Sequence, residues 1–202
     1  MAPRQRGDGI FTPGRWCGGY YELALEYTAG APGDVVDALE RLWMFPELDG
    51  CYLDDGREPE AQARVSFPAA LQFEEQLLGV ARFEDGARIA CGTYVMRDMD
   101  SSDWLVFYLP LGALEQVYPV GAFPFDSEDH NGWLRPLQSW LANLGRKLFR
   151  FVPYKLGLVG FELSMKNDAT ALAANGIPEE RDEGLLVPDN GCLRWFPPTT
   201  FQ

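Results

Sequence analysis

The middle of the chain contains three strand-like runs in close succession, and they constrain the fold more than any other feature. The runs cover residues 78–84, 87–96 and 103–110. Asp85 and Gly86 separate the first two, and this dipeptide tolerates the positive φ angles that a two-residue type I′ hairpin turn requires. The third run is apolar on both faces, which is typical of a strand inside a sheet. Consecutive strands joined by short turns run antiparallel, so the sequence predicts a mostly antiparallel sheet.

Two amphipathic helices are predicted to pack on that sheet. The longer one covers about 133–152, where apolar residues recur at i, i+3, i+4 and i+7 and basic residues gather near the C-terminus, which favours the helix macrodipole. The shorter one covers about 34–44, with Asp34 as a candidate cap and Pro46 as its stop. Each helix lies between strand-like runs, and this pattern allows two β-α-β halves. The predicted fold class is therefore α+β.

The chain of 202 residues is long enough for one domain, because a chain of this size buries roughly 70% of its unfolded surface. We expect that domain to span residues 19–198. Residues 1–18 are rich in Gly, Pro and Arg and have no hydrophobic periodicity, so we expect a flexible N-terminal arm. Near the other end, the sequence predicts a short helix over 168–175 and a hairpin whose turn contains 188–191.

The chain is strongly acidic, with 30 Asp and Glu residues, 17 Lys and Arg residues and a formal net charge of −13. Nucleic acids are bound by clustered Lys and Arg side chains, so we expect no nucleic-acid partner. An anionic membrane surface would repel the chain, and the longest apolar run, residues 104–114, is too short to cross a bilayer. The charge favours solubility, and this explanation needs no partner; alternatively, it would accelerate association with a basic protein partner.

The four cysteines never form a C-x-x-C pair, which argues against a zinc site or a thioredoxin-like site. We expect free thiols in a reducing compartment, and hence a cytoplasmic protein. The start of the chain lacks the apolar segment of a secretory signal peptide. No cofactor motif is present and we expect no cofactor, while nothing in the sequence indicates the oligomeric state.

Three glutamates are candidate ligand-binding residues. Glu162 ends an apolar strand-like run, where a buried carboxylate must find a partner or shift its pKa. Glu22 and Glu26 lie on the polar face of an alternating strand over 20–27, and they line the same cavity if that face is buried. Together these carboxylates would suit a small-ligand sensor with a sheet-lined pocket. The alternative is that they are exposed or paired with Lys or Arg.

A metal or acid-base site is a second chemical candidate. His130 is the only histidine, and it follows an acidic run that includes Asp126 and Asp129. Carboxylates beside an imidazole can bind a divalent cation or raise the imidazole pKa for acid-base catalysis, which would make the protein a hydrolase or a metal enzyme. Acidic residues also gather before helices because they cap the first turn, and this explanation needs no chemistry.

Aromatic residues outside the predicted core are candidate contacts for a partner, because exposed aromatic side chains often anchor protein interfaces. They are Tyr118, Phe123, Phe125 and Trp195. The chain has one histidine and no nucleophile motif, so we expect it not to be an enzyme. The leading hypothesis is a non-enzymatic binding module that engages a protein partner, as an immunity protein or a regulator does.

Overall fold

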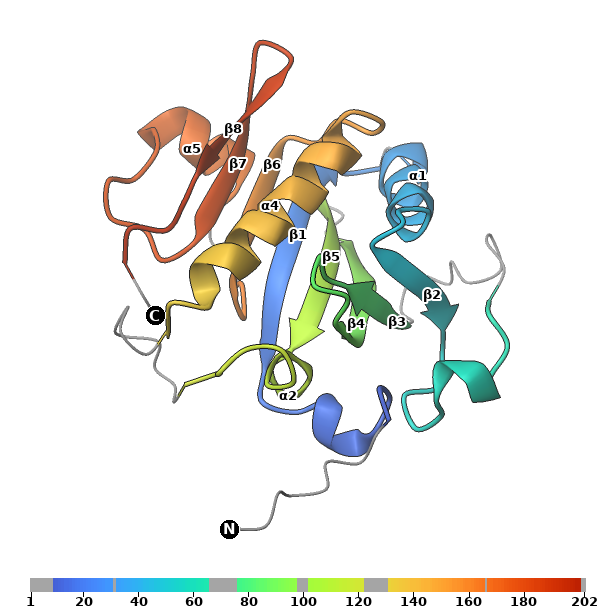
Figure 1. Ribbon diagram of the computed structural model, residues 1–202. Helices are drawn as coiled ribbons and strands as arrows, with labels where there is room; N and C mark the ends of the chain where they lie inside the picture. Colours follow the sequence, from blue (N-terminus) through green and yellow to red (C-terminus); the bar gives the residue numbers. More distant parts are fainter. Residues whose placement is uncertain are drawn as a thin grey trace.

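A continuous antiparallel sheet forms the centre of the protein, as the computed structural model shows (Figure 1). The structure describes residues 9–30, 32–65, 76–97, 102–121, 131–165 and 167–200. The sheet has eight strands in the order β2-β3-β4-β5-β1-β6-β7-β8, and all neighbouring strands are antiparallel. The strands are β1 Tyr20–Thr28, β2 Leu48–Tyr52, β3 Leu77–Arg82, β4 Arg88–Arg97, β5 Ser102–Pro110, β6 Leu156–Phe161, β7 Gly184–Asp189 and β8 Cys192–Phe196. The prediction of a mostly antiparallel sheet is therefore confirmed.

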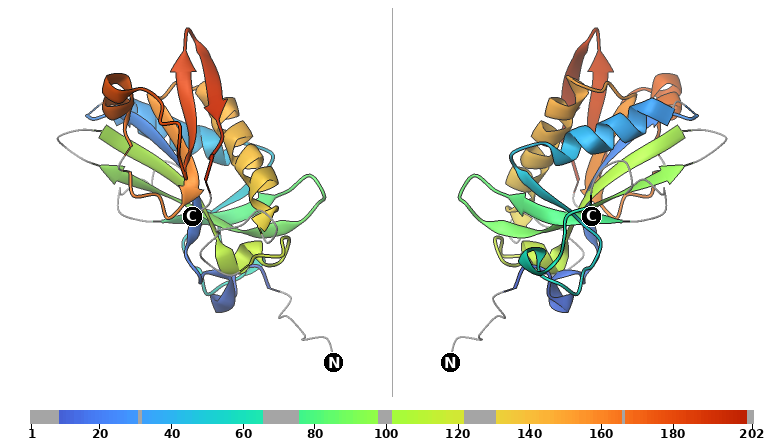
Figure 2. Two further views of the ribbon diagram at one scale, coloured as in Figure 1. Left: turned by 90° about the vertical axis from the view of Figure 1, so that its left-hand side faces the viewer. Right: turned by 90° about the vertical axis from the view of Figure 1, so that its right-hand side faces the viewer.

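Helices pack on both faces of this sheet, with two longer helices on one face and a short one on the other. They are α1 Pro32–Trp43, α2 Leu111–Leu114, α4 Leu134–Phe149 and α5 Ala169–Asn175, with short 3-10 helices η1 Pro13–Arg15 and η2 Pro59–Ala61. The helices α1 and α4 pack on one face, and α5 packs on the other (Figure 2). Asp34, the predicted cap, lies inside the first turn of α1 because Pro32 begins the helix. Among the described residues, no helix is both long and apolar enough to cross a membrane.

Strand β1 lies between β5 and β6, and its alternating side chains divide the two layers. Tyr21, Leu23 and Leu25 belong to the large core that α1 and α4 cover. Because successive side chains of a strand point to opposite faces, Glu22 and Glu26 point to the other face, beside the smaller apolar cluster under α5. The predicted polar face of this strand is therefore buried as well.

The two strand-helix-strand segments differ in topology. Strands β1 and β2 flank α1 and are separated in the sheet by β3, β4 and β5. Strands β5 and β6 flank α4 and are separated only by β1. The segments are thus not equivalent units, and the strand order does not support two similar β-α-β halves.

The turn between β3 and β4 corrects one prediction. The Phe83 N–H donates to Ala87 O (2.9 Å) and the Gly86 N–H donates to Phe83 O (3.0 Å). Gly86 has a φ of +85°, whereas Asp85 is not among the residues with positive φ. The predicted type I′ turn, which needs positive φ at both central residues, is therefore wrong. The Asp85 side chain instead accepts a hydrogen bond from the Ala87 N–H (2.9 Å), which stabilises a longer loop with glycine in the left-handed position.

The hairpin predicted near the C-terminus has the two-residue turn that the first one lacks. Asn190 and Gly191 connect β7 to β8 with φ angles of +49° and +80°. Asp189 pairs directly with Cys192 on either side of them. Two consecutive left-handed residues match the right-handed twist of the strands.

The short helix α5 has the predicted boundaries. Asp168 Oδ1 accepts a hydrogen bond from the Ala171 N–H (2.6 Å), which is a typical N-terminal cap. Gly176 follows the helix with a φ of +77°. Residues Ala169 and Leu172 of this helix pack against the smaller apolar cluster, which fixes the helix on the sheet.

The predicted flexible arm, residues 1–18, is packed against the protein from Gly9 onward. Phe11 is only 1% exposed and belongs to the large core. The backbone N–H groups of Ile10 and Phe11 donate to the Glu58 carboxylate at 2.9 and 3.0 Å. An apolar side chain within a polar, glycine-rich segment is a weak signal in the sequence, and its burial depends on the distant Glu58.

Candidate functional site

Two of the glutamates predicted to bind a ligand lie on the central strand and are almost fully buried. Glu26 is 1% exposed and Glu22 is 4% exposed. Both point to the sheet face opposite α1 and α4. A carboxylate at such a position must be bonded by the protein or by a ligand, because burial without a partner is costly.

The protein itself occupies the Glu26 carboxylate. Its Oε1 atom accepts a hydrogen bond from Ser102 Oγ (2.6 Å), and its Oε2 atom accepts one from the Ala169 N–H (2.7 Å). Lys155 Nζ lies 3.7 Å from the same carboxylate. Because Ala169 begins α5, Glu26 ties this helix to the sheet. Its role in this arrangement is structural.

Glu22 holds the segment that follows β6 in the same way. Its Oε2 atom accepts a hydrogen bond from the Leu163 N–H (2.7 Å), and its Oε1 atom accepts one from the Tyr94 hydroxyl (3.0 Å). Burial raises the pKa of Glu22, the two hydrogen bonds partly offset this, and the nearby charge of Glu162 raises it further. The carboxylate is thus fully bonded yet electrostatically disfavoured in its charged form.

Glu162 is exposed, unlike the other two candidates. Its φ of +43° is in the left-handed region, which is uncommon for a residue other than glycine. It lies beside Gly19, where an added Cβ would be only 2.6 Å from Glu162 Oε1. The structure therefore places Glu162 near Glu22, at the end of β1 where the Glu162 N–H bonds Tyr20 O, whereas Glu26 lies four residues farther along the strand. Glu22 and Glu26 have bonds to the protein, and Glu162 is exposed.

An aromatic pocket lies beside Glu22, and the sequence did not point to it. Its volume is about 460 Å³. The lining residues come from the N-terminal segment, β1, β3, β5 and the connection after β2: Trp16, Tyr20, Leu53, Asp55, Gln76, Leu78 and Tyr108. Tyr108 pairs with Glu22 in the β1–β5 register, so it points to the same face, opposite α4.

The Tyr108 ring is fixed by its surroundings. It packs edge-on against Tyr20 with ring centroids 4.8 Å apart, and its hydroxyl donates to Gln76 Oε1 (3.0 Å). Gly92 lies opposite Tyr108 in β4, and a Cβ there would be 2.3 Å from the ring. The missing side chain at Gly92 therefore lets the ring lie across the neighbouring strand.

Asp55 gives this pocket its charge. Its backbone oxygen accepts a hydrogen bond from Trp16 Nε1 (3.2 Å), which holds the indole at the pocket wall. Its carboxylate makes no hydrogen bond or ion pair with any residue in the described ranges. The pKa of Tyr108 is raised mainly by burial, then by Tyr20, Cys91 and Tyr94, and least by the charge of Asp55. Aromatic walls around an unpaired carboxylate are suited to a cationic group.

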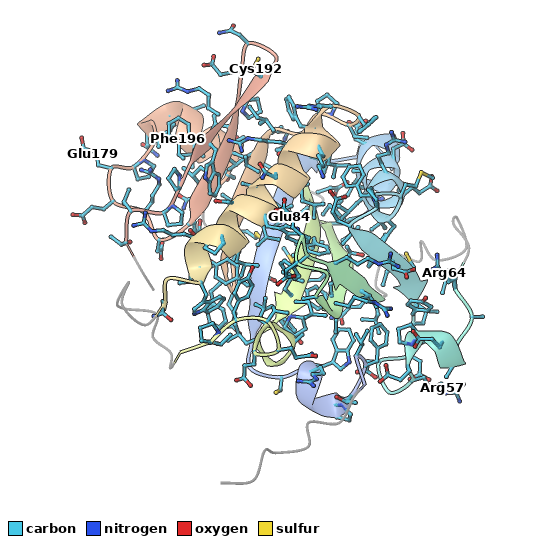
Figure 3. All side chains as sticks on the ribbon, viewed as in Figure 1. Arg57, Arg64, Glu84, Glu179, Cys192 and Phe196 are labelled. Atoms are coloured by element: carbon cyan, nitrogen blue, oxygen red, sulfur yellow. The ribbon has the colours of Figure 1, made fainter. Side chains whose placement is uncertain are left out.

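Two of the four cysteines are buried thiols of low reactivity. Cys51 and Cys91 are buried, and burial raises the pKa of Cys51 to about 12 and also raises that of Cys91. Cys17 and Cys192 are exposed free thiols, and Cys192 lies near the outer tip of the β7–β8 hairpin (Figure 3). Thiols with raised pKa values are poor nucleophiles at neutral pH.

The predicted metal site falls outside the described residues. Asp126, Asp129 and His130 all lie in the range 122–130, which the structure does not describe. Within the described part of the chain, no three His, Cys, Asp or Glu side chains are grouped as metal ligands. The hypothesis of a hydrolase or a metal enzyme therefore stays a prediction.

Two of the aromatic residues predicted to contact a partner also pack against the protein, and their contact with a partner stays a prediction. Tyr118 is half-buried, with its ring centroid 5.7 Å from that of Trp133. Trp195 is half-buried over Gly184, where an added Cβ would be 2.0 Å from the indole. The other two, Phe123 and Phe125, lie outside the described residues.

Comparisons with models of protein families, with curated proteins and with solved structures found no match for this chain. The geometry of the site is therefore the basis for any functional conclusion.

Proposed function

We propose that the protein is a non-enzymatic binding module that engages a basic protein partner, and that the aromatic pocket receives a Lys or Arg side chain of that partner. The supporting observation is that exposed Asp55, whose carboxylate forms no ion pair with a described residue, lines the same pocket as the rings of Trp16, Tyr20 and Tyr108. A cation over an aromatic face gains roughly 0.5–2 kcal/mol, and the carboxylate adds a charge-assisted contact.

The overall charge supports the same kind of partner. A net charge of −13 attracts a basic surface over a distance and speeds its association, most strongly at low ionic strength. The pocket then supplies the local contact that long-range attraction alone does not give. Among the described residues, those that line the pocket are aromatic, aliphatic, amide and acidic, a set suited to binding a cation.

A small-ligand sensor is the second candidate, because a volume of about 460 Å³ falls within the range of small-molecule sites. The ligand would be cationic for the same reason as the partner side chain. Glu162 does not line this pocket, so Asp55 takes the role that the sequence suggested for it.

Calorimetric titration with capped tripeptides tests the proposal. The series Gly-Lys-Gly, Gly-Arg-Gly and Gly-norleucine-Gly varies the charge while norleucine keeps the apolar stem. We expect the two cationic peptides to bind and Asp55→Asn to weaken them about tenfold, the equivalent of one charge-assisted contact. Asp54→Asn is the matched control, because Asp54 is an adjacent exposed acid that pairs with Arg57.

Two outcomes would contradict the proposal: equal affinity for the norleucine and lysine peptides, or no binding of any of them. Tighter binding of free arginine amide than of the peptides would favour the sensor over the partner module. Equal losses in the Asp54 and Asp55 variants would mean that net charge, and not the pocket, is responsible.

A further inference from the structure

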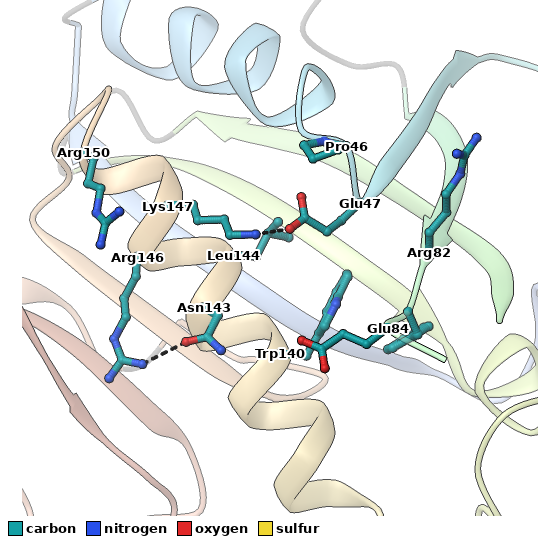
Figure 4. Close-up of a pocket in the computed structure, with 11 residues that line it drawn as sticks. Pro46, Glu47, Arg82, Glu84, Trp140, Asn143, Leu144, Arg146, Lys147 and Arg150 are labelled. Carbon is teal, nitrogen blue, oxygen red and sulfur yellow. Dashed lines mark hydrogen bonds and ion pairs between the residues drawn. The ribbon is translucent and has the colours of Figure 1, made fainter. Parts of the chain in front are cut away.

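A second groove lies on the sheet face that carries α4, and it differs in charge from the aromatic pocket. It has a volume of about 520 Å³ and lies between α4, the residues before β2 and the end of β3 (Figure 4). Its lining residues are Pro46, Glu47, Arg82, Phe83, Glu84, Trp140, Asn143, Leu144, Arg146, Lys147 and Arg150.

The groove has a basic wall on α4 and a wall of mixed charge opposite it. The α4 wall carries Arg146, Lys147 and Arg150, and the opposite wall carries Glu47, Glu84 and Arg82, whose guanidinium forms an ion pair with Asp49 (Figure 4). Lys147 forms an ion pair with Glu47 across the groove. Any anion that enters near Lys147 must therefore compete with the carboxylate of Glu47.

Two of the groove's cations have no acidic partner. Arg146 donates to Asn143 Oδ1 (3.0 Å) and forms no ion pair within the described ranges, and Arg150 forms no hydrogen bond or ion pair with any described residue. They lie four residues apart on α4, so their side chains are neighbours and repel each other. The helix C-terminus offsets part of that repulsion. An anion between the two guanidinium groups would offset the rest, with two or more charge-assisted hydrogen bonds.

Apolar surface continues from these cations along α4. Leu144 is buried beneath the groove, and half-buried Trp140 packs on Phe83 with ring centroids 4.9 Å apart. A ligand held by the cations at one end would extend over this surface at the other. Glu84 lies beside Trp140 (Figure 4) and would repel a negative charge. The part of the ligand over Trp140 must therefore be uncharged or cationic.

From this arrangement we propose that the groove binds an organic phosphate monoester, with the phosphate at Arg146, Lys147 and Arg150 and a ring or short apolar chain over Trp140. A phosphate monoester has a charge of about −1.5 to −2 and three acceptor oxygens, which suits three cations better than a carboxylate does. This site is independent of the proposed contact with a basic partner, because it lies on the other face of the sheet.

The test is calorimetric titration of the full chain with phenyl phosphate, inorganic phosphate, benzoate and phenol. Phenyl phosphate should bind tightest, inorganic phosphate and benzoate at least about fivefold more weakly, and phenol not detectably, because only phenyl phosphate uses both ends of the groove. Equal affinities for phenyl phosphate and inorganic phosphate, or no binding of phenyl phosphate, would overturn the proposal.

Some variants should weaken phenyl phosphate binding and one should tighten it, and this contrast distinguishes binding in the groove from a general effect of net charge. Arg146→Gln and Arg150→Gln should each weaken phenyl phosphate about fivefold to tenfold. The control is Arg135→Gln, an exposed arginine near the start of the same helix, which should leave the affinity unchanged. Glu47→Gln should tighten binding severalfold, because it removes the competing carboxylate and frees Lys147. An unchanged or weaker affinity in Glu47→Gln would contradict the proposed position of the phosphate.

The Asp55→Asn variant shows whether phenyl phosphate binds in the groove or in the aromatic pocket. Asp55 lies in the aromatic pocket, so its loss should leave phenyl phosphate binding unchanged. A reduced affinity for phenyl phosphate in this variant would mean that the ligand is not in the groove.

Discussion

The aromatic pocket and the α4 groove occupy opposite faces of one sheet, and they are constructed differently. In the pocket, Tyr20 and Tyr108 project from paired central strands, and Tyr108 is only 2% exposed. In the groove, Arg146, Lys147 and Arg150 are surface side chains of one helix. Strand pairing fixes the pocket before a ligand arrives, whereas the groove must order long side chains on binding and lose their rotamer entropy.

This difference predicts how stability and binding are linked in the two regions. A change to a pocket wall should affect folding and binding together, because the same side chain serves both. A change to a charged groove residue should affect binding with little effect on the free energy of unfolding, since exposed ion pairs contribute little to stability.

Truncation of the main ring in each region should give the largest effect and the clearest difference. Tyr108→Ala should reduce the free energy of unfolding by about 3–5 kcal/mol, since it empties a fully buried aromatic position. Trp140→Ala should cost about 2 kcal/mol, because that indole is only half-buried. Urea denaturation followed by far-UV circular dichroism measures both values. Equal losses would mean that the two walls are equally part of the core.

Tyr108→Phe serves as the control for the ring itself. It keeps the ring but removes the hydroxyl that donates to Gln76 Oε1, and it should cost about 1 kcal/mol. A loss as large as that of Tyr108→Ala would show that the hydroxyl, and not the ring, stabilises this region.

A smaller effect is expected where the backbone of β4 makes room for the Tyr108 ring. Gly92→Ala should destabilise the protein by about 1–3 kcal/mol and weaken cationic peptides, because the new methyl group displaces the ring. Gly14→Ala is the control, since a Cβ there meets nothing within 4 Å and Gly14 is not among the glycines with positive φ. A Gly92→Ala variant with wild-type stability and wild-type peptide affinity would refute this account of the pocket.

These features also show which parts of the molecule could be predicted from the sequence. The alternation around Glu22 and Glu26 correctly indicated one face for both carboxylates, because strand periodicity is a local property. The pocket needs the pairing of Tyr20 with Pro110 and of Glu22 with Tyr108, and those partners are far apart in the chain. No local pattern encodes such a register.

Turn geometry was the other limit. Asp85 and Gly86 carry a sequence signal for a two-residue turn, yet the Asp85 side chain bonds the backbone of Ala87 and a longer loop results. The dipeptide Asn190-Gly191 carries the same kind of sequence signal, and there a two-residue turn does form. A dipeptide therefore indicates that a turn exists, while the side-chain hydrogen bonds around it select the turn type.

The smallest expected effect on the free energy of unfolding concerns Glu22, which pairs with the pocket residue Tyr108 between β1 and β5, and this effect depends on pH. Burial raises its pKa above the ordinary glutamate value of about 4.5, so the folded state binds this proton more tightly than the unfolded state. Between 4.5 and the raised pKa the folded protein carries more of this proton, and the contribution of Glu22 to the free energy of unfolding therefore falls as the pH rises through that window.

Glu22→Gln should remove this pH dependence while it keeps the carbonyl oxygen that can accept from the Leu163 N–H and an amide that can bond Tyr94. We expect the variant to gain stability relative to the wild type as the pH rises above 4.5, and the difference to become constant below it. Urea denaturation of both proteins across the pH range gives this difference directly. Glu179→Gln, at an exposed glutamate far from the pocket (Figure 3), should show no such trend. A difference between wild type and Glu22→Gln that stays constant with pH would mean that the buried carboxylate is not disfavoured by its surroundings.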